Sequence, residues 1–280
     1  MDRGLVPSAA LALTVASFVC ASPPRKLVAQ WLKYPTAGVP RSRDGKPNLT
    51  APTPRTREGK PDFSGMWLTA DGFPCTQQTV GPQCGAELPM SRYGINMGAG
   101  LPGGLPYQPW AAEQVKHETE QNSKDDPHAR CLPDTFVRLY GLPHMQKIVQ
   151  VPGLLMMIYE LNASYRQVFT DGRPLPADPQ PSWNGYSSGQ WEGDTLVVDS
   201  IGFRDGLWLD IVGSPMTDAA KVRERIRRPD YGHLEIEVSV DDSKAYTRPW
   251  TVTLKQNIVV DTELVDEICL ENEKSKLIGK

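Results

Sequence analysis

The stretch KVRERIRRPDYGHLEIEVSV, residues 221–240, decides the fold of this chain. Side chains alternate between the two faces of a strand, so one face of the first half carries Lys221, Arg223, Arg225 and Arg227. Across a turn at RPDYG, one face of the second half carries His233, Glu235 and Glu237. Opposite charges then face each other, each pair worth about 0.2–1 kcal/mol. The other face of this hairpin must be core, because it collects Val222, Ile226, Leu234, Ile236 and Val238.

Short apolar segments of the same kind continue on both sides of this hairpin. After Cys131 they read KIVQV, LLMMIYE, YRQVFT, TLVVDS, LWLDIV, WTVTLKQ and IVV. Nothing between them is long enough to be a crossover helix between parallel strands. The sequence therefore predicts a mainly β, antiparallel barrel of eight or nine strands, with a β-sandwich as the alternative.

Two further segments precede these strands. Residues 63–280 are predicted as one β domain, interrupted at 71–130 by a Gly/Pro-rich loop and one helix from Pro109 to about Ser123. Residues 22–62, rich in Pro, Lys and Arg, are predicted as an extended arm. The arm contains a repeat, RSRDGKPNLT at 41–50 and RTREGKPDFS at 55–64. In each copy the acid-Gly pair favours a turn and the proline an extended exit, so we expect two similar turns.

The N-terminal residues are typical of an export signal. Residues 1–21 contain Arg3 and then about 16 weakly apolar residues, short of the roughly 20 that span a bilayer. We therefore expect a periplasmic or extracellular protein with no membrane span after cleavage; a lipoprotein anchor at Cys20 is the alternative. The net charge of −3 indicates no surface for nucleic acid.

Cleavage leaves Cys75, Cys84, Cys131 and Cys269. An even number of cysteines in an oxidising compartment favours disulfides. Of three pairings we prefer a local Cys75–Cys84 clip with a long-range Cys131–Cys269 bond. A metal site is the alternative, but the chain has no CxxC pair.

Several segments carry a resemblance to a known family. GKPDFSGMW, ARCLP, SYRQVFTDGRPLP, WEGDTLVV and ICLENE resemble segments of a family of uncharacterised exported bacterial proteins, along almost the whole chain after the signal. This resemblance implies no activity, but it implies that ARCLP and ICLENE lie together, and so a Cys131–Cys269 bond. Gly65-Met-Trp67 is also similar to the Gly-x-Trp that opens the barrel of lipocalins and other calycins. That similarity implies a calycin-like barrel with Trp67 closing its floor.

Catalytic signatures are absent from the sequence. There is no Gly-x-Ser-x-Gly elbow, His-Glu-x-x-His or dinucleotide fingerprint. The four histidines are too widely spaced for a local metal motif. We therefore expect no metal and no cofactor.

The densest mixture of titratable and aromatic residues is YELNASYRQVFTDGR, residues 159–173. Glu160 ends an apolar strand, where a carboxylate can act as an acid or base. If the polar members of the next strand point into a barrel, Glu160, Tyr165 and Arg166 line a pocket with Trp183 and Tyr186 of the following loop. The alternative is a strand end in solvent, with Arg166 paired to a surface acid.

Three functions follow as hypotheses. The first is binding of a small organic ligand in a barrel cavity, oriented by Arg166 or Arg173 and lined by Trp67, Tyr165, Phe169, Trp183 and Tyr186. The second adds cofactor-free acid/base chemistry, a lyase, isomerase or hydrolase step, by Glu160 with His144 or Tyr165. The third is an envelope interaction module that docks through its basic arm.

Overall fold

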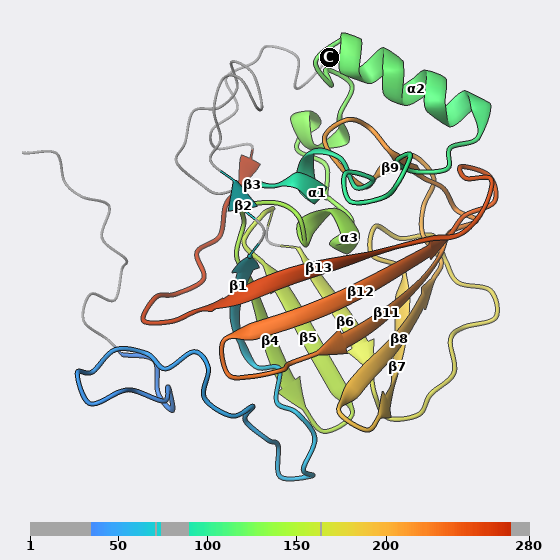
Figure 1. Ribbon diagram of the computed structural model, residues 1–280. Helices are drawn as coiled ribbons and strands as arrows, with labels where there is room; N and C mark the ends of the chain where they lie inside the picture. Colours follow the sequence, from blue (N-terminus) through green and yellow to red (C-terminus); the bar gives the residue numbers. More distant parts are fainter. Residues whose placement is uncertain (1–34, 71, 74–89, 163, 270–280) are drawn as a thin grey trace, which may run out of the picture.

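Nine strands close a single barrel in this computed structural model, which describes residues 35–70, 72–73, 90–162 and 164–269. In spatial order the strands are β1 (Gly65–Thr69), β13 (Trp250–Val259), β12 (His233–Asp241), β11 (Lys221–Arg227), β8 (Thr195–Ile201), β7 (Tyr186–Glu192), β6 (Tyr165–Phe169), β5 (Leu154–Tyr159) and β4 (Gln146–Val151). The short β1 closes the ring by pairing with both β13 and β4 (Figure 1). The predicted barrel is confirmed, and the sandwich is not what forms.

One strand pair departs from the predicted antiparallel order. β6 and β7 run parallel and share only two registered pairs, Val168 with Ser187 and Phe169 with Ser188. The connection between them, residues 170–185, contains no helix. The polar strand β7 (YSSGQWE) was not predicted, and Tyr186 was assigned to a loop, because this segment lacks the apolar run of a buried strand.

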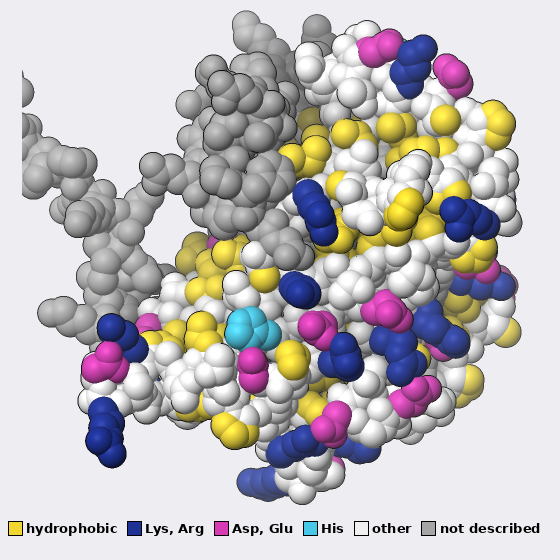
Figure 2. Space-filling model, viewed as in Figure 1, with side chains coloured by type: hydrophobic (Ala, Val, Ile, Leu, Met, Phe, Trp, Pro, Cys, Tyr) yellow, Lys and Arg dark blue, Asp and Glu magenta, His cyan; other side chains and the backbone are white. Residues whose placement is uncertain are grey.

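The hairpin at residues 221–240 forms as predicted. Arg227 pairs with Glu235 and Arg225 with Glu237 across β11 and β12. The apolar face of both strands is buried, and positive and negative side chains intermingle on the outer wall (Figure 2). Glu224 was not among the residues predicted for the core. It nevertheless occupies the core face of β11 and is completely buried.

Helices gather at one end of the barrel (Figure 1). They are α1 (Arg92–Ile95), α2 (Pro109–Glu120), the 3-10 helix η1 (Pro127–Arg130) and α3 (Phe136–Leu139). The predicted helix at 109–123 is α2, which ends three residues earlier; the single turns of α1 and α3 were missed because they are too short to show periodicity.

Two small ribbons lie outside the barrel: β2 (Gly72–Phe73) with β3 (Met90–Ser91), and β9 (Leu207–Trp208) with β10 (Pro215–Met216). Among the described helices, none has the length and apolar character needed to cross a membrane.

The two copies of the arm repeat fold into the same clip. Arg41 and Arg55 each form an isolated bridge to the proline six residues later. Each guanidinium also donates to the carbonyl of its turn glycine and pairs with an aspartate of the β domain, Arg41 with Asp261 and Arg55 with Asp194, both at 2.6 Å. The predicted pair of similar turns is confirmed, and the repeat gives the arm two matched attachments to the barrel.

A disulfide joins Cys131 to Cys269, as the resemblance implied. It ties the segment after β13 to the loop that follows η1. The predicted Cys75–Cys84 bond, the export signal at 1–21 with Cys20, and the arm before residue 35 lie outside the described residues.

Candidate functional site

The barrel interior is occupied by a buried ion pair. Arg166 of β6 and Glu224 of β11 face each other across the barrel, and both are almost completely buried. The Arg166 guanidinium also donates to the hydroxyls of Ser187 and Ser200, each at 3.0 Å. Tyr140, just after α3, donates to Glu224 at 2.8 Å. Each polar group of this cluster therefore has a partner inside the barrel.

This network excludes an open cavity beside these side chains. A void that admits water would leave accessible surface on its lining, yet Tyr140 and Glu224 have none and Arg166 has 2%. Burial and the Glu224 charge raise the pKa of Tyr140 well above its usual range. Burial lowers the pKa of the Arg166 guanidinium, whereas the nearby Glu224 carboxylate raises it. The net pKa of the guanidinium is raised. The guanidinium therefore stays charged, and the Arg166 and Glu224 side chains fill the space expected for a ligand.

The predicted ligand-binding residues divide between two places. Trp67 is completely buried, and its indole N–H donates to the Phe63 carbonyl at 3.0 Å. Tyr165, Phe169, Trp183 and Tyr186 instead line a groove of about 600 Å³ on the outer wall, over β6 and the start of β7. The structure therefore does not gather these residues in a single cavity inside the barrel. Alternation along β6 turns Arg166 inward and Tyr165 outward.

The groove combines exposed rings with neutral polar groups. Tyr165 is 58% and Tyr186 37% exposed. Arg204 stacks on Trp183, 4.3 Å from the ring centroid, and Arg173 stacks on Phe169 at 3.8 Å. The other polar side chains on the outer lining are hydroxyls and amides: Asn162, Ser164, Gln167, Ser182 and Asn184. No carboxylate contributes to the lining among the described residues.

The groove lies at the seam left by the parallel strands. Because β6 and β7 share only two registered pairs, their backbones separate beside Tyr165, and Asn184 fills the gap by donating to the Tyr165 carbonyl at 3.1 Å. Gly185 has φ 61°, and a Cβ there would lie 2.6 Å from the Ile201 carbonyl oxygen, so the chain can enter β7 at this point only without a side chain. Through this seam the inner Arg166 and Ser187 also border the groove.

The predicted catalytic residues Glu160 and His144 do meet. Glu160, just after β5, accepts from the Met145 amide at 2.9 Å and lies 3.9 Å from Nδ1 of His144. The same Nδ1 lies 3.0 Å from Glu267, which precedes the disulfide cysteine. Tyr165, the third predicted catalytic residue, belongs to the outer groove instead.

A second histidine, missed in the sequence, shares the His144 pocket. The pocket, of about 470 Å³, is lined by both His144 and His128 of η1. Nδ1 of His128 lies 2.8 Å from the buried carboxylate of Asp134, and Arg138 lies 3.2 Å from that carboxylate. Asp134 raises the pKa of His128, whereas burial lowers the pKa of His144 despite Glu267 and Glu160. Sequence spacing of 16 residues gave no signal that these rings would converge.

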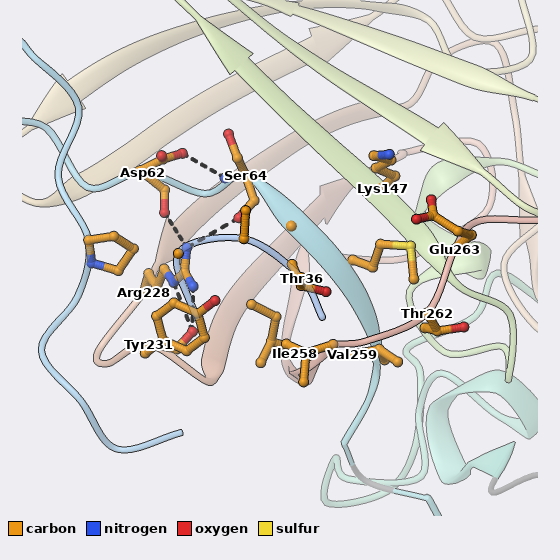
Figure 3. A pocket seen from close by; sticks show the side chains of 16 residues that line it. Thr36, Asp62, Ser64, Lys147, Arg228, Tyr231, Ile258, Val259, Thr262 and Glu263 are labelled. Atoms are coloured by element: carbon orange, nitrogen blue, oxygen red, sulfur yellow. Dashed lines mark hydrogen bonds between the residues drawn. The ribbon is translucent and has the colours of Figure 1, made fainter. Parts of the chain in front are cut away.

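A third pocket marks where the arm meets the opposite end of the barrel. Figure 3 shows Arg228 on one side of this pocket, close to Asp62 and Ser64 of the arm junction and to Tyr231 of the β11–β12 turn. The guanidinium donates to the main-chain carbonyls of all three and stacks on Trp67, 4.9 Å from the ring centroid. Burial lowers the pKa of Arg228 to about 10. These contacts tie arm and barrel together, so this pocket is structural.

No protein-family model, curated protein or solved structure matches this chain.

Proposed function

We propose that this is an exported protein that binds an uncharged, ring-containing organic molecule in the outer groove, and that saccharides are the class it takes. The observation that carries this proposal is the gathering of four aromatic side chains, two of them well exposed, in one groove. Exposed rings are costly unless a partner covers them. The groove volume of about 600 Å³ lies within the range of small-molecule sites.

The lining chemistry selects the ligand class. Aromatic faces pack against the C–H faces of sugar rings, and the Gln167 amide can pair with ring hydroxyls. Arg173 and Arg204 lie beside the groove and already stack on its aromatic rings, Arg173 is paired with Asp171, and Arg166 of the lining is paired with Glu224. An anionic group would gain little there, so a neutral, hydroxyl-rich ring fits best.

Removing a groove ring is expected to weaken saccharide binding. Trp183→Ala and Tyr186→Ala should each raise the Kd for cellotetraose or maltotetraose about tenfold or more, because each removes a stacking surface worth about 1.4 kcal/mol or more. Calorimetric titration of wild type and variants measures this, with folding checked by circular dichroism.

The matched control is Trp110→Ala, since Trp110 is 46% exposed but lies on α2, outside the groove. Binding that survives both groove substitutions, or that falls equally with Trp110→Ala, would contradict the proposal.

A second candidate function is acid/base catalysis in the His128–His144 pocket. The observation that favours it is the convergence of two imidazoles, each with Nδ1 beside a carboxylate, on one cavity. Each Nε2 then remains for proton transfer. A neutral His144 acts as the base, Glu160 and Glu267 stabilise its cation, and a protonated His128 acts as the acid.

The pH profile tests this candidate. His144 is neutral above its lowered pKa and His128 is protonated below its raised pKa, so p-nitrophenyl acetate hydrolysis should rise with pH through the first and fall through the second. His144→Gln should lower the rate about 100-fold, and His128→Asn should remove the alkaline fall. A rate unchanged by His144→Gln, or lowered as much by His233→Gln, would exclude catalysis there.

A further inference from the structure

We propose that His117, Glu118 and Asp125 bind a divalent transition-metal ion at the C-terminal end of α2. Each residue offers one ligand atom, and these three atoms lie within 4.8 Å of one another. His117 and Asp125 are exposed, so an ion can enter from solvent, while Glu118 forms the buried base of the group.

A second observation, independent of this clustering, also points to a cation. Glu118 is only 6% exposed, and its Oε2 has no hydrogen-bond partner among the described residues. Its aliphatic stem lies against Gly213, where a Cβ would be 3.2 Å from Glu118 Cβ and Cγ. A buried carboxylate oxygen without a partner is strongly unfavourable. A bound cation would supply the missing partner.

The chain reverses after α2 in a way that brings the third ligand back. Asn122 and Ser123 both adopt left-handed backbone angles, φ 53° and 54°, and the Ser123 amide donates to the Glu118 carbonyl at 2.7 Å. Asp125 is thereby placed beside the last turn of the helix. It also pairs with Arg130 at 2.7 Å, but both side chains are well exposed. Such a surface pair contributes little to stability, so a metal ion can displace Arg130.

The donor set defines the class of ion. One imidazole nitrogen with two carboxylate oxygens suits Zn²⁺ or Mn²⁺ better than Ca²⁺, which prefers six to eight oxygen ligands. Three protein ligands leave room for water on the ion.

Calorimetric titration of the untagged, disulfide-bonded protein with Zn²⁺ tests this site. One ion per chain should bind, with a rise in Tm. His117→Ala should weaken binding at least tenfold, whereas His233→Ala should leave it unchanged, because the His233–Asp230 pair lies on the β11–β12 hairpin. No binding, or binding unaffected by His117→Ala, would overturn the proposal.

Glu118→Gln separates a metal site from a structural role. Without metal this variant should have a Tm equal to or above that of the wild type, because it keeps the shape and breaks no hydrogen bond of Oε2 among the described residues. With Zn²⁺ it should lose the Tm increase. A metal-free variant with a lower Tm than the wild type would mean that the carboxylate is already satisfied by the protein, and would contradict the site.

Discussion

Replacing Glu224 with alanine should lower the free energy of unfolding by about 3–5 kcal/mol, because it leaves the Arg166 charge buried without a counter-ion. Arg166 is only 2% exposed on the inner face of β6, so almost none of its charge would be hydrated after the loss of Glu224. Tyr140 would also lose its 2.8 Å acceptor. Urea denaturation followed by tryptophan fluorescence measures the loss.

Two controls separate the buried pair from ordinary charges and from packing. Arg223→Ala breaks the exposed Arg223–Asp199 pair and should cost at most about 1 kcal/mol. The double replacement Arg166→Met with Glu224→Leu should recover most of the stability, because no unpaired charge remains and the Ser187 and Ser200 hydroxyls still bond each other at 2.8 Å. A Glu224→Ala loss below about 1 kcal/mol would contradict a closed interior.

Arg228→Ala is expected to cost about 2–4 kcal/mol and to release the arm. The substitution removes the donor for the Asp62 and Tyr231 carbonyls and the group stacked on Trp67. Arg228→Lys should recover only part of the loss, since one ammonium cannot donate in all these directions.

The readout that isolates the arm is limited trypsin digestion. Faster cleavage at Arg55 and Arg57 is expected in Arg228→Ala, under conditions where a β-domain fragment remains intact. Arg227→Ala, which breaks the exposed Arg227–Glu235 pair, should not change cleavage. Equal cleavage rates for Arg228→Ala and wild type would contradict the clamp.

Much of the fold could be predicted because alternation is a local property. The hairpin of β11 and β12 and the core face of its apolar residues follow from patterns of two-residue period, and the number of such strands favoured a barrel, with a sandwich as the alternative. β7 escaped prediction because its burial comes from small residues, Ser187 and Gly189, rather than from apolar ones. Glu224 was the available signal for the interior network: a carboxylate on an otherwise apolar face needs a buried cation.

The candidate sites were harder to predict, because they depend on contacts between distant segments. Glu160 and His144 meet because the pairing of β4 with β5 places the ends of those strands together. The outer groove depends on the parallel β6–β7 pair, which no local pattern indicates. Whether Arg166 or Tyr165 faces inward was also open, since alternation divides a strand into two faces without saying which is buried.

Nuclear magnetic resonance tests directly whether the ligand binds outside a closed barrel. The protein would be labelled at methionine methyls and tyrosine rings, then titrated with cellotetraose and maltotetraose. Met157 lies inside the barrel, 3.6 Å from the Tyr140 hydroxyl, whereas Tyr165 and Tyr186 lie in the groove. Saturable shifts of the Tyr165 and Tyr186 rings are expected, with the Met157 methyl unchanged. A shift centred on Met157, or no shift with either saccharide, would contradict binding in the outer groove.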